Sequence, residues 1–505
     1  MGTTRHDGPE LALGDAGESV APRVGRNIAA LASGQAVTWA MTLLWTLVVP
    51  RALGPAGMGW VVAAWSVTGV LGIVLGLGTR TYLVRELVVN RAAGPRLVGT
   101  AIVLRVVSAP LFICAVVVYS RLADYGHDAT LVLYLFAGAT LLTLVAEPMQ
   151  AAFQALERMQ YLAYSDVITK SAQGLLGIGL VLIGFRAVGI AACALVVAAV
   201  VIALNARWLR GQLAIDLRTS TARLREMTKA SFAYWAFGIF FLIYLWIDAV
   251  MLSLMTRAEV VGWYGVPTKL FQTLMFLPVI VSTAWLPRLV SAFEQGREQL
   301  DRTARAPLEL VLLLSLPICA ATVVGARPAV HLLYGSAYDE SIPVLVILGL
   351  CVPPIYLNIM LSQVLIAANR LSSWTRVMAG ATVLNPLVNL ALIPLTDDRY
   401  GNGAIGAALS LLVTEIVIVS VGFAMVGRHV LDQAALRRCA RVAAASLAMW
   451  ATAYAASPLG PLASIVTGGG TFVLAAIALR VATPEERSLL RSQAARLLRR
   501  IPGTR

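Results

Sequence analysis

Seven charged residues stand inside long apolar segments of this chain, and their types and spacing could carry chemistry. They are Arg105, Glu147, Asp166, Lys170, Asp248, Lys269 and Glu415. Each surrounding segment is about 20 residues long, which is the length of a helix that crosses a bilayer. A charge at the bilayer centre costs roughly 2.5 to 3.5 kcal/mol on insertion scales. Charges kept there therefore pair with each other, or bind an ion or a charged cargo.

Asp248 and Lys269 stand at matching depths on neighbouring segments. Asp248 lies seven residues before Met255, and Lys269 lies eight residues after Val261. At 1.5 Å per helical residue, both lie about 10 to 12 Å below the outer end of their segments, so we expect them to pair. The pair is either a structural ion pair that holds two helices together or a binding site. In the second case Lys269 contacts an anionic phosphate, and Asp248 is its counter-ion or a proton site.

A second cluster lies nearer the opposite end of its segments. Arg105, Glu147, Asp166 and Lys170 all lie about 9 to 15 Å from the inner surface by the same counting. Asp166 and Lys170 share a helix face because they are four residues apart. Two acids and two bases at one depth neutralise each other, so we expect a structural charge network here.

Two further charges are candidates on weaker grounds. Glu415 lies near the middle of an apolar segment and has no partner that the sequence identifies, so it is protonated or faces water. With Asp248, it is a candidate coupling-ion residue. Arg80 lies at the inner end of the second segment, where it either meets an anionic headgroup or anchors the topology.

The elements that position these charges are membrane helices. Hydrophobic residues make up 59% of the 505 residues and charged residues 13%, which excludes an ordinary water-soluble fold. The apolar pattern predicts about 14 spans. Their approximate extents are 28–49, 58–79, 97–119, 130–152, 162–184, 187–209, 232–255, 261–286, 306–324, 342–367, 374–395, 401–426, 442–456 and 462–481.

The arginines predict the orientation. They cluster in alternate gaps, for example in 80–96, 207–225 and 428–441, and these gaps face the cytoplasm by the positive-inside rule. Both termini are then cytoplasmic, in a multi-pass protein of the plasma or inner membrane. The same placement explains the net charge of +14 without a nucleic-acid partner. We expect a disordered tail over 1–26 and an amphipathic helix over 483–505 that rests on membrane lipids.

The sequence contains no motif for a cofactor or a metal. Its five cysteines have no C-x-x-C spacing and the histidines do not cluster, so neither a disulfide framework nor a zinc site is predicted. The phosphate-binding pattern G-x-x-x-x-G-K-[ST] is absent, which argues against direct ATP hydrolysis. The outward gaps are short and offer little room for catalytic residues. We therefore expect no enzyme activity.

A weak internal repeat divides the chain near residue 228. Residues 56–60 recur at 259–263, 155–159 at 367–371 and 189–195 at 404–410, in the same order. This predicts two six-helix lobes, 27–228 and 229–438, followed by two appended spans in 439–482. Because six is even, both lobes have the same orientation. They are then related by a pseudo-two-fold axis along the membrane normal, with a central cavity between them.

Several motifs resemble the polysaccharide-export flippases of the multidrug/oligosaccharidyl-lipid/polysaccharide exporter superfamily, over almost the whole chain. They are Val48–Pro55 running into Gly59 and Trp60, Asp248–Met251, Val261–Tyr264 with Lys269, Leu286–Leu289, and Leu333–Tyr338. The resemblance implies two lobes around a V-shaped cavity lined by the first, second, seventh and eighth helices. It implies a cargo of polyprenyl-pyrophosphate-linked oligosaccharide, moved to the outer leaflet by alternating access. A polysaccharide polymerase would then be a partner.

Three alternatives stay open. An integral-membrane glycosyltransferase or polysaccharide polymerase handles the same lipid carriers, but such enzymes generally place catalytic residues on a sizeable outer loop. A cation-coupled multidrug exporter of the same superfamily would share the architecture, but net positive charge at the candidate cavity positions disfavours cationic drugs. A lipid II flippase is the nearest alternative, because its cargo is also a polyprenyl pyrophosphate.

Overall fold

The structure is a computed structural model that describes residues 20–427 and 430–481, and within these ranges it is all α-helical apart from turns and short 3-10 segments. The predicted amphipathic tail, 483–505, and the first 19 residues lie outside the described part. The helices are α1 Val20–Gly76, α2 Thr79–Val89, α3 Gly94–Leu122, α4 His127–Ala155, α5 Met159–Leu182, α6 Arg186–Arg210, α7 Thr221–Met255, α8 Ala258–Leu274, α9 Phe276–Glu294, α10 Arg297–Tyr334, α11 Ser341–Ala367, α12 Leu371–Tyr400, α13 Gly403–Val426, α14 Gln433–Ala455 and α15 Pro461–Ala478.

The predicted spans all fall on helices, so the prediction of an all-α membrane fold is confirmed. The first two spans lie on α1, the eighth lies on α8 and α9 together, and each other span has a helix of its own. Within the described residues, nine helical segments are long and apolar enough to cross a membrane. The short helix α2 follows the second span and was not predicted. Residues 20–26, expected in the disordered tail, belong to α1.

Two of the helices are interrupted. In α1, Gly54 has φ 67° and ψ 176°, so the chain reverses there and α1 is two helices joined by a kink. Helices α8 and α9 are separated at Met275. The hydroxyl of Tyr356 donates to the carbonyl of Leu274 at 2.6 Å, so the break keeps this carbonyl satisfied inside the membrane region.

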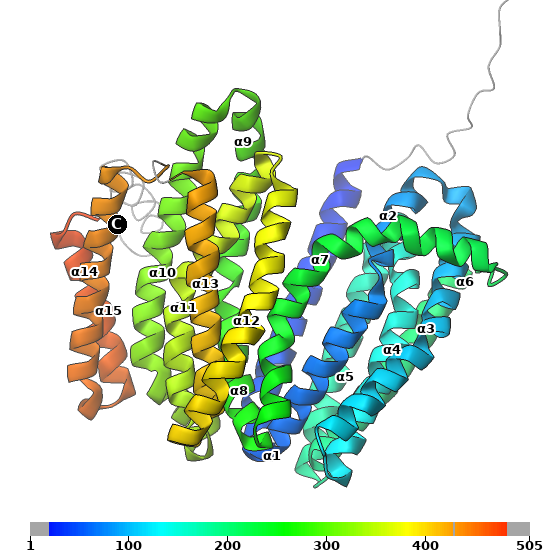
Figure 1. The fold of residues 1–505 in the computed structure, drawn as a ribbon, viewed down its shortest axis with the longest axis horizontal. Coiled ribbons are helices and arrows are strands. Elements are labelled where there is room, and N and C mark those ends of the chain that lie inside the picture. The colour runs from blue at the N-terminus through cyan, green and yellow to red at the C-terminus, as the bar shows by residue number, and fades with distance from the viewer. Residues whose placement is uncertain (1–19, 428–429, 482–505) are drawn as a thin grey trace, which may run out of the picture.

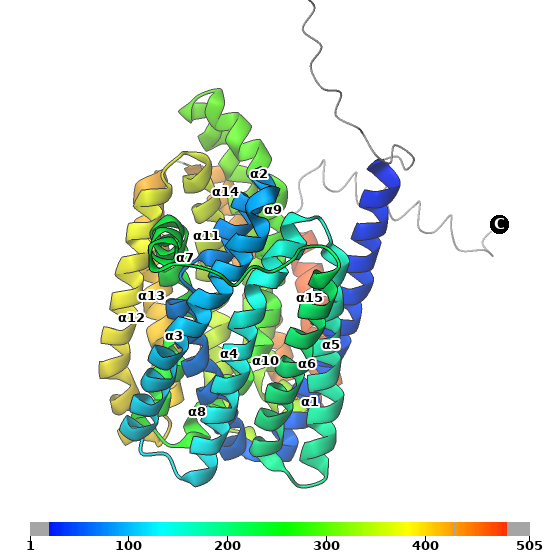
Figure 2. The ribbon, with the colours of Figure 1, turned by 90° about the vertical axis from the view of Figure 1, so that its right-hand side faces the viewer.

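The helices form two bundles (Figure 1). Helices α1 to α6 make the N-terminal lobe, and α7 to α13 make the C-terminal lobe. Figure 2 faces the N-terminal lobe and shows α3, α4, α5 and α6 running alongside one another. The lobes meet where α1 packs against α7 and α8. The N-terminal part of α7 also crosses α2 and α3 before α7 joins the C-terminal lobe.

The helices α1 and α8 meet through a reciprocal pair of backbone contacts. A Cβ atom on Gly59 would lie 1.8 Å from the carbonyl oxygen of Ala258, and a Cβ atom on Gly262 would lie 2.1 Å from that of Pro55. The register that matches Gly59 with Gly262 in the sequence repeat also matches Pro55 with Ala258. The two contacts are therefore related by a pseudo-two-fold axis, and each requires a glycine.

The second repeat forms the same turn in both lobes. Glu157, between α4 and α5, has φ 57°, and Asn369, between α11 and α12, has φ 56°. In each turn the following arginine donates its backbone N–H to a carbonyl five residues earlier, at 2.8 Å: Arg158 to Phe153 and Arg370 to Leu365. This shared geometry supports the predicted duplication.

Further contacts join the lobes at the end where α1 reverses. Tyr119 of α3 and Ser253 of α7 have hydroxyl oxygens 2.5 Å apart. Tyr338, in the short segment after α10, donates its hydroxyl to the carbonyl of Pro50 at 2.8 Å. The two lobes are therefore held together at this end, which the arginine pattern predicts to be the outer one.

The appended helices α14 and α15 pack on α10 at the edge of the C-terminal lobe (Figure 1). Arg438 of α14 and Glu309 of α10 form an ion pair at 3.0 Å. Asp432 caps α14 by accepting from the backbone N–H of Ala435 at 2.8 Å. That bond, with the nearby Arg305 guanidinium, lowers the pKa of the Asp432 carboxyl.

Candidate functional site

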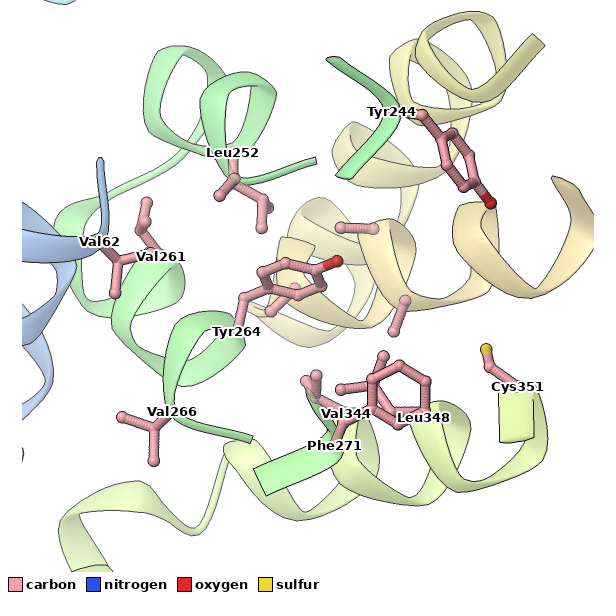
Figure 3. Packing of buried hydrophobic residues seen from close by; sticks show 14 of the residues in the cluster. Val62, Tyr244, Leu252, Val261, Tyr264, Val266, Phe271, Val344, Leu348 and Cys351 are labelled. Carbon is pink, nitrogen blue, oxygen red and sulfur yellow. The ribbon is translucent and has the colours of Figure 1, made fainter. Parts of the chain in front are cut away.

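Asp248 lies in the interior of the C-terminal lobe, where it is 4% exposed. Its carboxylate accepts from the Tyr264 hydroxyl at 2.9 Å and from the Asn389 side-chain amide at 2.6 Å. The same amide donates to Asn385 at 2.9 Å. Figure 3 shows Tyr264 projecting from α8 into the packed interior of this lobe. The buried carboxylate is thus stabilised by neutral hydrogen-bond donors rather than by a cation.

The predicted pairing of Asp248 with Lys269 is wrong. Lys269 comes five residues after Tyr264 on α8, which places it about 140° further around the helix. Because Tyr264 points at Asp248, Lys269 points away from it. Counting residues along the helices predicts a depth for each charge, but it contains no information on the direction in which either side chain points.

Glu415 is the second buried carboxylate of the C-terminal lobe, at 2% exposed. It accepts from the Tyr244 hydroxyl at 2.9 Å and from the Asn358 amide at 2.9 Å. Tyr244 lies one helical turn before Asp248 on α7, so the two carboxylates belong to one polar cluster. We call Tyr244, Asp248, Tyr264, Asn358, Asn385, Asn389 and Glu415 the carboxylate cluster.

Lys269 extends from α8 towards the N-terminal lobe. Its ammonium nitrogen lies 5.0 Å from the centroid of the Trp65 ring and 5.7 Å from that of Trp246. Trp246 is two residues before Asp248 on α7, so it faces the opposite side of that helix. The contacts are cation–π interactions, which stabilise a desolvated ammonium without neutralising it. Within the described residues, Lys269 forms no ion pair.

Lys269 lines a pocket that reaches into the N-terminal lobe. The pocket has a volume of about 100 Å³ and is lined by Met41, Thr42, Trp45, Thr46, Trp65, Phe136, Lys170, Gln173, Gly174, Ile190, Ala194 and Lys269. We call it the lysine pocket. It is bounded by α1, α4, α5, α6 and α8, so the lining includes helices of the N-terminal lobe beyond the four that the resemblance implied.

The predicted charge network divides into two parts. Arg105, at 3% exposed, pairs with Glu147 at 2.9 Å and also donates to the carbonyl of Leu75 and the hydroxyl of Thr79, both at 2.6 Å. These bonds tie α3 to α4, to the end of α1 and to the start of α2. Lys170 is not part of this group, because it lines the lysine pocket.

Arg80 lies near the pocket rather than in it. Its side chain is exposed and lines a surface hollow with Thr81, Val84, Arg85 and Gln154. Asp166, on α5, lies within electrostatic range of both Arg80 and Lys170. A row of charges therefore runs from the start of α2 along α5 to the lysine pocket.

The sequence analysis missed the neutral residues that complete both sites. The aromatic partners of Lys269 are Trp65 and Trp246, and the donors to the two carboxylates are tyrosine and asparagine side chains. Asn385 and Asn389 carried a usable signal, because they are four residues apart in an otherwise apolar span, as Asp166 and Lys170 are. The tryptophans carried none, because aromatic residues are common in membrane helices.

Two helical bundles, joined along their inner helices around buried charges, define a membrane transporter of the multidrug/oligosaccharidyl-lipid/polysaccharide exporter superfamily. The model of the polysaccharide biosynthesis protein family matches residues 24–293, more than half of the chain, and the protein belongs to this family. The MatE family model matches residues 235–391.

Solved structures share this fold. The lipid II flippase MurJ, in an inward closed conformation, superposes with a TM-score of 0.71 at 14% identity, covering 90% of this chain and 98% of that one. An inward-facing multidrug resistance MATE family transporter superposes with a TM-score of 0.63 at 15% identity, covering 77% and 94%. No protein of curated function matches the sequence.

Proposed function

We propose that the protein moves a polyprenyl-pyrophosphate-linked oligosaccharide, the repeat unit of a polysaccharide, from the cytoplasmic to the outer leaflet. The observation that carries this proposal is Lys269, a cation without an ion-pair partner among the described residues, in a pocket between membrane helices. Such a cation suits an anionic headgroup and repels a cationic drug. Membership of the polysaccharide biosynthesis family supports a saccharide cargo.

The energetics suit export of an anion. A pyrophosphate diester carries about two negative charges, and an inside-negative potential favours its outward movement by about 2.3 kcal/mol per charge at 100 mV. The loaded protein is then driven outward, and the difficult step is the return of the empty protein. Arg80, exposed at the end that the arginine pattern predicts to be cytoplasmic, is positioned to attract the headgroup.

The return step is assigned to the carboxylate cluster. Asp248 and Glu415 are buried at the centre of the C-terminal lobe. The side-chain oxygen of Asn389 is buried there without a hydrogen-bond partner among the residues that the structure describes. Carboxylate and amide oxygens bind a hard cation, and a carboxylate also takes a proton. In this proposal a cation or proton entering from outside binds here and favours the inward-facing state.

Alternating access requires the two lobes to separate at the end where they now meet. The reciprocal contacts of Gly59 and Gly262 hold the backbones of α1 and α8 together there. The break at Gly54 interrupts α1, and the break at Met275 separates α8 from α9. These two breaks can absorb the rotation of one lobe against the other. Release of the cargo to the outer leaflet would break the glycine contacts, and the return step would form them again.

The proposed orientation places both termini in the cytoplasm of a cell with this protein in its plasma or inner membrane. Single cysteines at Asp128, Asp339 and Asp398 in a cysteine-free protein should react with an impermeant thiol reagent in intact cells. Cysteines at Arg91, Arg218 and Arg437 should not react. Labelling of the second group instead of the first would reverse the orientation.

A second candidate is supported by the likeness to a lipid II flippase, whose cargo carries the same pyrophosphate link. Both functions are tested by chemical analysis of lipid-linked intermediates in cells that lack the protein. Complete polysaccharide repeat units should accumulate on the inner leaflet, and the surface polymer should be missing. A polymerase that joins the delivered units would be a partner. Accumulation of lipid II would favour the second candidate, and accumulation of incomplete units would favour an enzyme.

A further inference from the structure

A further cavity, with a volume of about 760 Å³, lies at the end of the molecule where α1 reverses. Its walls come from the turn between α3 and α4 in one lobe and the turn between α7 and α8 in the other, with one residue each from α1 and α12. Both turns lie at the lower end of Figure 1. The lining residues are Trp60, Ala123, Asp124, Tyr125, Gly126, His127, Asp128, Ala129, Ser253, Leu254, Met255, Thr256, Arg257, Ala258 and Asp397. We call this space the outer cavity, because the arginine pattern predicts that this end faces outward.

The outer cavity lies on the seam where the two lobes meet. Ser253, which lines it, shares the 2.5 Å hydrogen bond with Tyr119 of the N-terminal lobe. Ala258, which also lines it, has the backbone carbonyl that faces Gly59 in the reciprocal contact of α1 and α8. The cavity is therefore complete only while the lobes are in contact at this end.

The size of the outer cavity indicates the kind of ligand that it would take. Sites for small molecules enclose about 300 to 1,000 Å³. A stable protein interface instead involves about 20 to 30 residues on each partner, and 15 residues line this cavity. The dimensions therefore favour a small molecule over a docked protein.

The charge of the lining disfavours an anion. Asp124, Asp128 and Asp397 supply carboxylates, and Arg257 supplies one guanidinium. In the part of the chain that the structure describes, the side chains of Asp124, Asp128 and Arg257 form no ion pair and no hydrogen bond. A phosphate or a diphosphate would be repelled by the excess of negative charge. The described residues also contain no group of three metal-ligating side chains, so a bound metal ion is not indicated.

The same side chains suit the hydroxyl groups of a sugar. A carboxylate only accepts hydrogen bonds, and hydrogen bonds from a hydroxyl to a charged acceptor are stronger than those between neutral groups. The Arg257 guanidinium donates only, so it suits the ring and hydroxyl oxygens. The rings of Trp60 and Tyr125, both partly buried, offer apolar area to the C–H face of a sugar ring.

We propose that the outer cavity binds a saccharide from the outer side of the membrane and that this binding holds the lobes together at the outer end. A ligand that contacts both lobes binds the closed arrangement more tightly than the separated one, so it shifts the population towards the closed state. Saccharide that accumulates outside would then slow further export. The inference rests on the proposed function, because the saccharide is the repeat unit that the protein delivers.

The binding test uses the full-length protein in lipid nanodiscs and, as the probe, oligosaccharide released by partial hydrolysis from the surface polysaccharide of the producing cells. Calorimetry measures the affinity. Asp124→Asn and Asp128→Asn should each weaken binding at least about fivefold, because each replaces a charged acceptor with a neutral one. Asparagine tolerates the backbone φ of 46° at position 124, so the turn should keep its shape. Asp398→Asn, an exposed carboxylate outside the lining, is the matched control and should bind as the unsubstituted protein does.

Two further measurements locate the bound saccharide. Binding should change the tryptophan fluorescence, and Trp60→Phe should keep the affinity within about threefold while most of the fluorescence change is lost, because Trp60 is the tryptophan that lines the cavity. Inorganic pyrophosphate should not displace the oligosaccharide. Displacement by pyrophosphate, or an unchanged fluorescence response in Trp60→Phe, would place the saccharide elsewhere and overturn the proposal.

The effect on transport is measured in liposomes that contain the protein and its lipid-linked cargo. Free oligosaccharide added on the outer side at saturation should slow translocation at least about fivefold, and the same addition on the cytoplasmic side should have no effect. Asp124→Asn should require about fivefold more oligosaccharide for the same inhibition. An unchanged rate with the cavity occupied would overturn the proposed control of the outer end.

Failure of the outer site differs from failure of the proposed function. Absence of oligosaccharide binding to the unsubstituted protein, or equal binding by Asp124→Asn and Asp128→Asn, would overturn the site even if the protein moves the lipid-linked cargo. Aspartate-dependent binding in a protein that moves no lipid-linked oligosaccharide would leave the site in place and reject the proposed function.

Discussion

The lysine pocket, lined by Lys170 of the N-terminal lobe and Lys269 of the C-terminal lobe, presents ammonium groups to an open space. The carboxylate cluster instead lies buried among amides and phenols inside the C-terminal lobe. These sites occupy equivalent places in the repeat. The register that pairs Gly59 with Gly262 pairs Trp45 of the lysine pocket with Asp248 of the carboxylate cluster. The register that pairs Glu157 with Asn369 similarly pairs Gln173 with Asn385.

The two sites differ in whether their charged groups have hydrogen-bond or ion-pair partners. In the carboxylate cluster, Asp248 and Glu415 each receive one phenol and one amide hydrogen bond from within the lobe. In the lysine pocket, the ammonium of Lys269 has aromatic rings beside it but no counter-ion among the described residues. The carboxylate cluster is therefore satisfied largely from within its own lobe, whereas the lysine pocket is not. Under the proposed function, the carboxylate cluster would serve coupling and the lysine pocket would bind the anionic cargo.

The largest expected effect comes from a charge of the N-terminal lobe that is paired. Arg105→Ala removes a buried guanidinium that joins Glu147, Thr79 and the Leu75 carbonyl, so it should lower the free energy of unfolding by about 3 to 5 kcal/mol. Thermal unfolding of the purified protein in detergent measures this. Arg302→Ala, from an exposed pair with Glu298, is the control and should have almost no effect. Equal effects would mean that Arg105 is not a structural charge.

The second-largest loss of stability is expected at the reciprocal glycine contacts between α1 and α8. Gly59→Ala and Gly262→Ala each push a Cβ atom into a facing backbone carbonyl, so each should cost about 1 to 3 kcal/mol of stability. Because the contacts are reciprocal, the two losses should be similar. Gly325→Ala on α10, whose Cβ would meet nothing within 4 Å, should be neutral or slightly stabilising. A large loss at one glycine and none at the other would disprove the symmetric interface.

Removal of the unpaired charge should affect transport rather than folding. Lys269→Gln keeps most of the side-chain length, so the protein should accumulate normally while translocation falls about tenfold, equivalent to about 1.4 kcal/mol. Lys269→Arg should retain part of the activity. Lys229→Gln should be unchanged. A normal translocation rate for Lys269→Gln would show that the lysine pocket does not bind the cargo.

The carboxylate cluster should respond differently to loss of its charge. Asp248→Asn keeps one oxygen that accepts from Asn389, and its new amide N–H can donate to the Tyr264 hydroxyl oxygen, so the fold should survive. We expect translocation to lose its dependence on an imposed cation or proton gradient, with a reduction of about fivefold when a gradient is present. Binding of inorganic pyrophosphate should be unaffected. Weaker pyrophosphate binding in this variant would show that the two sites are not separate in function.

The features of the fold that could be predicted are those that depend only on position along a helix axis. Apolar length placed the spans, and arginine alternation predicted an orientation. Helical rise predicts one depth for Asp248 and Lys269, but their pairing was wrong because the direction in which a side chain points depends on how neighbouring helices pack. Lys170 was grouped with Arg105 for the same reason. The partners of Glu415 lie on α7 and α11, far away in sequence, and no local pattern points to them.

The central claim is tested most directly by transport in liposomes. The purified protein is reconstituted with an undecaprenyl-diphosphate-linked oligosaccharide in one leaflet, and its arrival in the other leaflet is followed by enzymatic oxidation of the exposed sugar. Transfer should be fast with the unsubstituted protein and at least about tenfold slower with Lys269→Gln. Transfer at the rate of protein-free liposomes would contradict the account.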